Sequence, residues 1–332
     1  MHVVVKRFLN KFILLIICMH CQEHTFESKH WSFPIDAQGK LPSSLSPAEG
    51  NLIADSCGQC HVDQYKNWEE SLHSKSISNG LMWQLPKLGE STSDSCFNCH
   101  SPLKETAMLV QMQAGFSKNY RKDWGEYLPS NTHNLGISCA SCHVRNHIRY
   151  GPPSRNKNDD LENLPHNGYV TLPEFESSQF CKSCHESPDT VSKIKGKKMM
   201  ETYSEWESSL YAKKGIHCQN CHMPDRKHKW KGIHDKEMVQ SGLNQDLHLE
   251  IENQNLKITA ILRSINIGHK FPTYSVPKIY MRLYLKDSTG RRKFLKDHII
   301  GRLVDIDMKN EFFDTRLSPN KFVSLETKIP IS

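Results

Sequence analysis

The feature that most constrains this chain is a five-residue pattern, Cys-x-x-Cys-His, which takes up ten of its twelve cysteines. Random placement of 12 Cys and 19 His among 332 residues gives about 0.02 copies of such a pattern, so its repetition indicates a common chemical function. The five copies are Cys57–His61, Cys96–His100, Cys139–His143, Cys181–His185 and Cys218–His222.

Two thiols at this spacing can add to the two vinyl groups of a porphyrin, and the adjacent imidazole can bind its iron. The sequence therefore predicts five covalently bound haem c groups, each with its iron. The predicted attachment residues are Cys57, Cys60, Cys96, Cys99, Cys139, Cys142, Cys181, Cys184, Cys218 and Cys221. The predicted proximal iron ligands are His61, His100, His143, His185 and His222.

Two other interpretations of paired cysteines fit less well. Zinc sites built from CxxC units use them in pairs, and they do not require a His directly after every second Cys. The number of units here is odd, and all five are followed by His. Disulfide frameworks of secreted chains rarely repeat a single spacing. Haem attachment remains the interpretation that uses every residue of the pattern.

Composition agrees with a chain that wraps porphyrins. Successive motifs start 39, 43, 42 and 37 residues apart, which brings neighbouring haems close together. Only 37% of the residues are hydrophobic and the mean hydropathy is −0.60, so we expect the porphyrins to supply much of the apolar core. The two propionates of each haem offset the net charge of +7, and the basic residues form no stripe, so no nucleic-acid partner is expected.

The N-terminus is typical of an export signal. Lys6, Arg7 and Lys11 precede an apolar run that is too short to span a bilayer, which predicts a signal peptide over residues 1–21. We therefore expect an exported, periplasmic protein. Membrane association through this end stays open, either as an uncleaved surface anchor or through a lipid on one of the two cysteines near position 20. The rest of the chain is predicted to form a linker at 22–50, a pentahaem cytochrome domain at 51–240 and a β domain at 241–332.

The last part of the chain alternates apolar and polar residues with period two, as strands do, and Asp287–Gly290 is a turn signal. The predicted strands are Leu247–Glu252, Leu256–Ile265 and Lys278–Lys286. In the preceding part, Ser101 as N-cap and Pro102 at the first position predict a helix over Lys104–Gln113. The fold class expected is α+β: a mostly helical, irregular multihaem module followed by a small antiparallel, sandwich-like β domain.

An internal repeat bears on the second axial ligand of each iron. Tyr65–His73 aligns with Tyr203–Tyr211, and in each copy the Trp and the Leu four residues later would share one helix face. The first copy ends in His73, a predicted distal ligand. The second ends in Tyr211, which marks a place where a haem could be left open or be served by another His.

Further candidates for distal ligands are less sharply defined. The predicted ones, beside His73, are His166, His228, His234 and His269; His133, His147 and His217 are additional His candidates, and Met82, Met108, Met112 and Met223 are weaker ones. An electron carrier needs a second strong ligand at each iron, whereas a catalytic haem needs an open position.

Residues around the first and fifth motifs resemble the cytochrome c-554 superfamily, which includes hydroxylamine oxidoreductases and ammonia-forming nitrite reductases. The matching residues are Cys57–His61 followed by Tyr65, Trp68, Ser71 and His73, then Cys218–His222 followed by Met223, Pro224, His228 and Gly232–Asp235, and finally Gly268–Thr273. The resemblance implies a haem-packed helical fold, two His ligands at most irons, export and periplasmic electron transfer. The CxxCK motif of the nitrite reductases is missing here.

Three functions remain after this comparison. The first is electron transfer between redox partner proteins of the respiratory chain. The second is an oxidoreductase that acts on a small nitrogen or sulfur oxyanion at one open haem. The third is an assembly partner whose β domain docks to a larger complex. The missing CxxCK motif favours an electron carrier over a catalyst.

Overall fold

The computed structural model describes residues 26–116, 136–156, 164–189 and 193–331. The predicted signal peptide and the two cysteines near its end lie outside the described residues. The chain divides after Ser32 into two units, and helix α2 (Phe26–His30) is the described element of the first. In α2 the rings of Phe26 and His30 stack with their centres 5.2 Å apart. Everything that follows concerns the second unit, from residue 33 onward.

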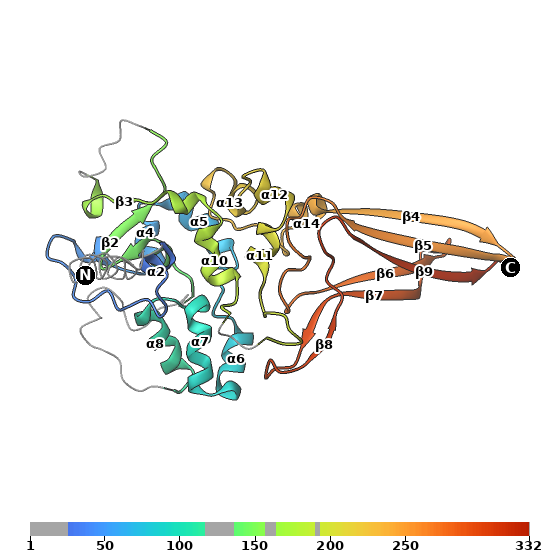
Figure 1. Ribbon diagram of the computed structural model, residues 1–332, viewed down its shortest axis with the longest axis horizontal. Helices are drawn as coiled ribbons and strands as arrows, with labels where there is room; N and C mark the ends of the chain where they lie inside the picture. Colours follow the sequence, from blue (N-terminus) through green and yellow to red (C-terminus); the bar gives the residue numbers. More distant parts are fainter. Residues whose placement is uncertain (1–25, 117–135, 157–163, 190–192, 332) are drawn as a thin grey trace, which may run out of the picture. The chain divides into compact units, whose positions relative to one another are not determined.

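The helical region, residues 33–242, is built from short helices joined by loops (Figure 1). They are α3 (Pro47–Gly50), α4 (Ala54–Gly58), α5 (Val62–Glu70), α6 (Asn79–Leu88), α7 (Glu90–His100), α8 (Lys104–Gln113), α9 (Cys139–His143), α10 (Gln179–His185), α11 (Thr202–Glu207), α12 (Leu210–Lys213), α13 (Cys218–His222) and α14 (Lys236–Gly242), with single 3-10 turns η3 (Pro165–Asn167), η4 (Pro173–Glu176) and η5 (Pro224–Arg226). A small mixed sheet joins them: β1 (Val144–Arg145), β2 (Ile148–Gly151) and β3 (Val170–Thr171).

The Cys-x-x-Cys-His motifs coincide with helix ends. Helices α7, α9, α10 and α13 each end at the His of a motif, and α4 ends inside the first motif. Residues three apart lie side by side on a helix, so one turn places both thiols of a motif on the same side. Two of these turns start with a capping box, with Ser138 and His217 as the N-cap residues.

The helix predicted at Lys104–Gln113 is confirmed as α8, but its predicted cap is wrong. Leu103 is the N-cap, with extended backbone (φ −74°, ψ 134°), and Ser101 instead donates its hydroxyl to Thr106 Oγ1 at 2.9 Å. Helix α8 buries Leu109 and Val110 in a local apolar core. This core is part of the helical region's own packing.

The repeat folds differently from its predicted helix. Helix α5 ends at Glu70. Trp68 lies inside the helix and is buried, with 2% of its surface exposed, whereas Leu72 lies beyond the helix end and is 47% exposed. In the second copy α11 ends at Glu207, and Leu210 is likewise exposed. The predicted shared face of Trp and Leu is therefore wrong in both copies, because each helix stops before the Leu.

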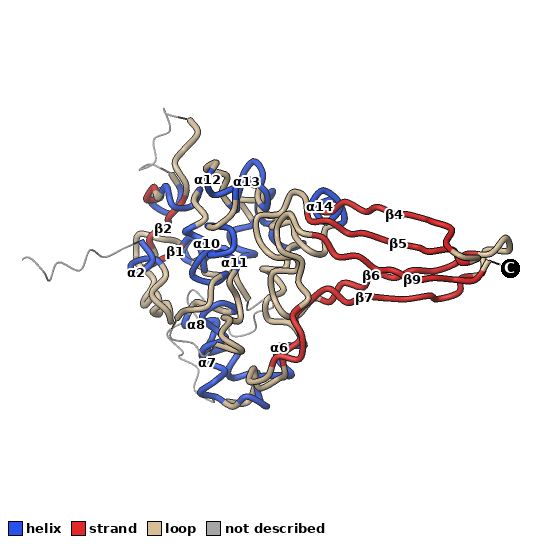
Figure 2. Tube along the Cα trace, turned by 45° about the vertical axis from the view of Figure 1, so that its right-hand side comes forward, coloured by secondary structure: helices blue, strands red, loops and turns tan. Residues whose placement is uncertain are grey.

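The β region, residues 243–331, contains two antiparallel sheets that run alongside one another (Figures 1 and 2). One sheet has the order β4 (Leu243–Glu252), β5 (Asn255–Ser264), β9 (Phe322–Pro330), and the other β6 (Lys278–Lys286), β7 (Arg292–Val304), β8 (Glu311–Asp314). Their shared core centres on Leu262, Ile300 and Leu317. The three predicted strands are present as β4, β5 and β6, and the fold is α+β with a sandwich-like β part, as expected.

The free edge of the first sheet is only partly covered. Leu247, Leu249 and Ile251 of β4 pair with residues of β5 and share a face with the buried Ile258. Their side chains are nevertheless 61%, 58% and 77% exposed. The facing sheet therefore does not reach over β4.

Candidate haem sites

Eight imidazoles of the described residues lie in four facing pairs. Each pair joins the His of one motif to a His from elsewhere in the chain. The distances between ring centres are 6.4 Å for His61–His166, 6.2 Å for His73–His185, 6.1 Å for His143–His228 and 6.2 Å for His222–His269.

These separations match two axial ligands on one metal ion. An imidazole nitrogen binds a metal at about 2.0 Å and lies about 1.2 Å from its own ring centre, so two rings on opposite sides of one ion have centres about 6.4 Å apart. Direct packing of two rings would allow a shorter contact. The uniform spacing therefore indicates that all four pairs have the same function, as two axial ligands of one metal ion.

Backbone carbonyls orient several of the motif imidazoles. His100 and His143 donate from Nδ1 to the carbonyls of Ser76 (2.8 Å) and Tyr150 (2.7 Å). His222 makes the same bond to the carbonyl of Lys231. A hydrogen bond at Nδ1 fixes the tautomer and leaves Nε2 for a metal, as in most metal-binding histidines.

The carbonyl beneath His143 is placed by a hairpin that directly follows the motif. Strands β1 and β2 pair antiparallel, and Asn146 and His147 form the tight turn between them with φ of 51° and 60°. Two successive left-handed residues are typical of the turn that joins strands with a two-residue loop. The turn folds Tyr150 back over the motif.

Burial keeps several imidazoles neutral, which is the form that binds a metal. Burial, reinforced by the neighbouring His185 and His222, lowers the pKa of His73 to about 3. Burial is also the largest cause that lowers the pKa of His143, His185 and His269 to about 4. These groups therefore carry no charge at neutral pH.

The distal members of the pairs come from loops. His166 sits in η3 with φ of 53° and donates from Nδ1 to the Gly168 carbonyl at 3.0 Å. His228 follows η5, and the ring of Trp230 lies 5.3 Å from it and 4.5 Å from His73. Trp230 thus contacts distal residues of two different pairs.

Cysteines of different motifs lie near one another. The thiols of Cys57 and Cys139, of Cys99 and Cys184, and of Cys181 and Cys218 are close enough to shift one another's pKa. Cys142 is close enough to interact electrostatically with Cys181 and Cys184. The motifs therefore form a row in the order first, third, fourth, fifth, with the second beside the fourth.

The two copies of the repeat share one anchoring contact. Trp68 donates its indole N–H to the carbonyl of Ile137 at 2.8 Å, and Trp206 donates to that of Ile216 at 2.9 Å. Each of these carbonyls lies two residues before the first Cys of a motif, the third motif for Trp68 and the fifth for Trp206. The Trp of each copy therefore anchors the segment in which that motif begins.

His100 differs from the other motif imidazoles. No second imidazole faces it among the residues that the structure describes, and its residue is exposed, as are His61 and His185. The hydroxyl of Ser76 donates to the carbonyl of His100 at 2.8 Å, in addition to the Nδ1 bond above. The candidate His133 lies outside the described residues.

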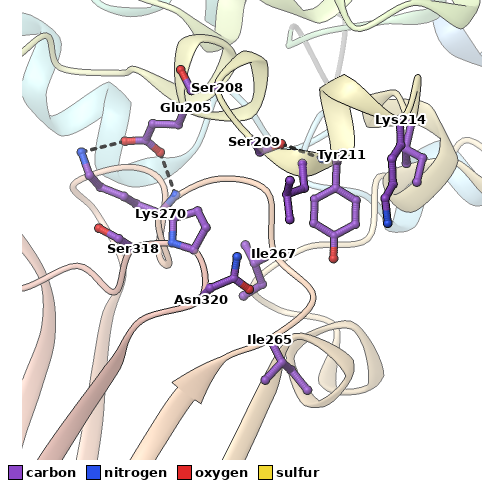
Figure 3. Close-up of a pocket in the computed structure, with 13 residues that line it drawn as sticks. Glu205, Ser208, Ser209, Tyr211, Lys214, Ile265, Ile267, Lys270, Ser318 and Asn320 are labelled. Atoms are coloured by element: carbon purple, nitrogen blue, oxygen red, sulfur yellow. Dashed lines mark hydrogen bonds and ion pairs between the residues drawn. The ribbon is translucent and has the colours of Figure 1, made fainter.

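Tyr211 does not face a motif imidazole. A Cβ added at Gly268 would lie 3.1 Å from the Tyr211 ring, so the two residues pack closely, and the next residue, His269, faces His222. The sequence left two alternatives for this position, an open haem or another His as the ligand. The structure places another His, His269, at the fifth motif. Tyr211 also lines a cavity of about 440 Å³ together with Lys214, Ile267 and Asn320 (Figure 3).

The remaining predicted ligands lie away from these pairs. His234 is exposed, and the structure does not bring it to a motif imidazole of the described residues. His147 places Nε2 3.2 Å from the Gly39 carbonyl, and His217 accepts at Nδ1 from the Ser178 backbone at 3.2 Å. The four Met candidates are partly buried, at Met82, Met108, Met112 and Met223.

The residues fit haem better than a bare metal ion. Within the described ranges, no group of three or more His, Cys, Asp or Glu side chains is arranged to hold a metal. Each pair offers two ligands, and a porphyrin would supply the other four to iron. Two thiols stand beside each motif imidazole, as covalent attachment requires.

Comparison with known proteins agrees with this geometry. Residues 56–144 match the family described as cytochrome c554 and c-prime. The fold is similar to the crystal structure of a penta-heme cytochrome c552 from Thermochromatium tepidum, at 18% identity and a TM-score of 0.62, over 85% of this chain and 88% of that one. No curated protein matches the chain. The motifs, the matched segment and the fold together show that the chain is a multihaem c-type cytochrome with covalently bound haem c.

Proposed function

We propose that the protein is a five-haem cytochrome c that transfers electrons in the periplasm. The observation that carries this proposal is the set of four imidazole pairs with ring centres 6.1–6.4 Å apart. A carrier needs two strong axial ligands at each iron, because its geometry must change little between the two redox states.

The pairs support a proposed set of ligands for four of the five sites. The first motif would use His61 and His166, the third His143 and His228, the fourth His185 and His73, and the fifth His222 and His269. Haem bound at these places supplies one-electron redox chemistry. Burial lowers the pKa of several of these ligands, and hydrogen bonds at Nδ1 orient His143, His166, His222 and His269.

The row of motifs supports transport along the molecule. Cysteines of different motifs lie close together, which puts successive attachment sites next to one another. Trp230 contacts both His73 and His228 and so fills the space between the third and fourth sites. A catalyst with a single redox centre would not require such a continuous row.

A second function has one observation in its favour. Among the described residues, the exposed His100 is the motif imidazole that faces no partner ring. If the iron there keeps an open position, the protein could act as an oxidoreductase on a small nitrogen or sulfur oxyanion. The other four sites would then deliver electrons to it.

Haem counting and spectroscopy test both proposals. We expect intact mass to show five haem additions, and replacement of both cysteines of one motif to remove one of them. A count other than five would contradict the proposed haem content. Carbon monoxide binding by the reduced protein and a high-spin ferric signal separate the two functions: neither is expected of a pure carrier, and both are expected if the His100 site is open. Replacement of Cys96 and Cys99 by Ala removes the haem of the second motif and must abolish such a signal, whereas His234→Ala, at an exposed position, should leave it unchanged.

The export proposal rests on the N-terminal pattern of basic residues followed by an apolar run. No described helix is long and apolar enough to cross a membrane. Fractionation should find the holoprotein in the periplasm, where its electron-donating and electron-accepting partner proteins would reach it. Recovery only with membranes would favour the anchored alternative.

A further inference from the structure

The loop Gly268–Thr273 brings part of the β region to the fifth motif. It connects β5 with β6, and it carries His269, whose ring lies 6.2 Å from that of His222 and nearly parallel to it at 18°. The two members of this pair therefore come from different regions of the fold. The pair of His222 and His269 therefore depends on contacts that hold this loop in place.

Glu205 of α11 makes two polar contacts to Lys270 of this loop. Its Oε2 accepts from the backbone N–H of Lys270 at 2.8 Å, and its Oε1 lies 3.0 Å from Lys270 Nζ. The side chain is only 11% exposed, so solvent screens these contacts weakly. Because Lys270 follows His269 directly, the bond fixes the peptide that carries the imidazole.

The imidazole is oriented by the same residue, Lys270. His269 donates from Nδ1 to the carbonyl of Lys270 at 2.9 Å. Glu205 therefore binds the N–H of the residue whose carbonyl orients the ring. A shift of this residue would turn the ring as well as move it.

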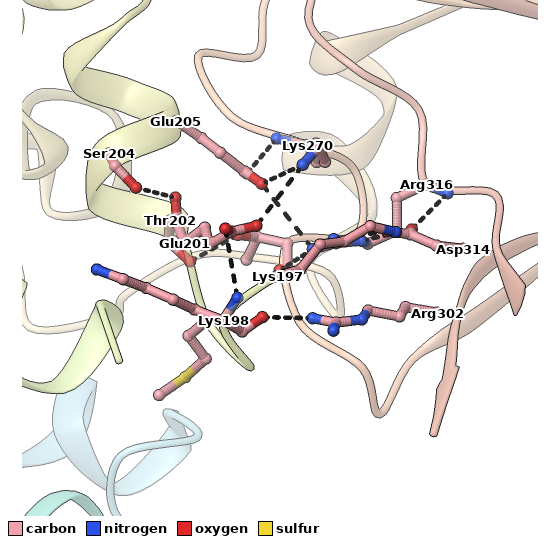
Figure 4. Close-up of polar contacts among 12 residues, drawn as sticks. Lys197, Lys198, Glu201, Thr202, Ser204, Glu205, Lys270, Arg302, Asp314 and Arg316 are labelled. Atoms are coloured by element: carbon pink, nitrogen blue, oxygen red, sulfur yellow. Dashed lines mark hydrogen bonds and ion pairs between the residues drawn. The ribbon is translucent and has the colours of Figure 1, made fainter. Parts of the chain in front are cut away.

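Other contacts hold the loop and the β region without Glu205. Within the β region, Phe271 and Leu317 exchange two backbone hydrogen bonds of 2.8 Å, and Arg316 donates to the Thr273 carbonyl at 3.0 Å, which ties the loop to the rest of its own region. Arg302, which is fully buried, donates to the Lys198 carbonyl at 2.6 Å (Figure 4). Lys197 pairs with Asp314 at 2.8 Å. Loss of Glu205 alone should therefore leave the two regions docked.

We propose that Glu205 is a positioning residue that holds His269 at the fifth haem, so that this haem's second ligand depends on a clamp between α11 and the β region. The proposal rests on the proposed ligation of the fifth motif by His222 and His269. It adds a residue that neither binds haem nor belongs to any motif.

The test uses the full-length holoprotein and the high-spin ferric signal in electron paramagnetic resonance, together with the haem count. Glu205→Ala removes both contacts, so we expect five attached haems of which one becomes high-spin. Glu205→Gln keeps an acceptor for the Lys270 N–H, so all haems should stay as in the wild type, while loss of a negative charge raises one reduction potential. Glu207→Ala, at an exposed position of the same helix, should change neither property.

His269→Ala gives the reference spectrum for a lost ligand. A spin change in His269→Ala without one in Glu205→Ala would overturn the role of Glu205 alone. No change in His269→Ala would contradict the ligation of the fifth motif and this proposal with it. If Glu205→Ala does not accumulate, Glu205→Asp takes its place: the shorter carboxylate should give a partial high-spin signal, and a wild-type spectrum would overturn the proposal.

Discussion

The two copies of the repeat agree in their first half and differ in their second. In both, a Tyr ring lies against the Trp, with centres 5.6 Å and 5.4 Å apart, and the Trp donates to a carbonyl just before a motif, the third in the first copy and the fifth in the second. After that the first copy ends in His73, which faces His185 of the fourth motif, whereas the second ends in Tyr211 against Gly268. The shared half positions a motif, and the different half decides where a distal imidazole comes from.

The copies also differ in how they are braced. In the first, Ser71 and Ser74 hydroxyls donate to backbone carbonyls at 2.7 Å and 2.9 Å, and the Tyr65 hydroxyl donates to Asp55 at 2.9 Å. Charged groups surround the second, where Lys270 lies 3.0 Å from Glu205. Regions with the same sequence pattern should therefore respond differently to truncation and to acid.

The largest difference is expected from the anchoring Trp. Trp68→Ala should lower the free energy of unfolding by about 3–5 kcal/mol, because it removes a fully buried aromatic side chain and a hydrogen bond. Trp206 is only partly buried, so Trp206→Ala should cost less. Denaturant unfolding of the holoprotein measures both, with the 60% exposed Trp83→Ala as control. Equal losses in the two copies would contradict the comparison.

The next effect concerns the ends of the copies. His73→Ala should convert one haem to the high-spin state, because the fourth motif would lose the imidazole that faces it. Tyr211→Phe should leave every haem unchanged, since Tyr211 faces no motif imidazole. Ferric spin state, measured at constant haem count, checks both. A spin change in Tyr211→Phe would assign that hydroxyl a role at iron.

A smaller effect is expected from acid. Burial alone would raise the pKa of Asp314, but hydrogen bonds from Arg316 and Lys197 outweigh it and hold the pKa below its usual range. A lowered carboxyl pKa stabilises the fold above the unfolded value, and this stability is lost as pH falls through the folded value. The wild type should therefore lose stability from about pH 5 downward.

Asp314→Asn isolates this contribution. At pH 7 it should cost on the order of 2 kcal/mol, because it weakens charge-assisted hydrogen bonds to a buried Arg. Between pH 7 and pH 3 it should lose less stability than the wild type does. Asp297→Asn, in a half-exposed pair with Arg282, should match the wild type in both respects. Parallel pH profiles for wild type and Asp314→Asn would argue against charged bracing.

The smallest effect should come from the exposed Leu of each copy. Leu72→Ala and Leu210→Ala should each change the free energy of unfolding by less than about 0.5 kcal/mol, as surface substitutions do. A larger loss of stability in either variant would support the predicted helix face shared by the Trp and the Leu. The same denaturant measurement decides.

Much of the local structure could be predicted from the sequence, because it depends on residues near one another. The motifs, helix α8 and strands β4, β5 and β6 are of this kind. The partners of the motif imidazoles were harder: sequence nominated His73 and His166, but nothing local says that they face the fourth and the first motif. Those pairings follow from tertiary packing across more than a hundred residues.

Two other features carry no residue-type signal. Any residue can offer a backbone carbonyl, so the roles of Ser76 and Tyr150 beneath motif imidazoles could not be read from their side chains. Alternation correctly put Leu249 on the inner face of its sheet, yet it does not say how far the opposing sheet extends. The prediction that Trp and Leu of the repeat share a helix face was wrong for a third reason: each helix ends before its Leu, although the sequence pattern continues.

The closeness of cysteines from different motifs bears on how the protein is assembled. Cys57 lies near Cys139 and Cys181 lies near Cys218, so haems attached at these residues would be neighbours in the folded chain. In an oxidising compartment the same proximity would favour wrong disulfides between motifs before haem is attached. We therefore expect correct maturation to require that these cysteines stay reduced until each has its haem.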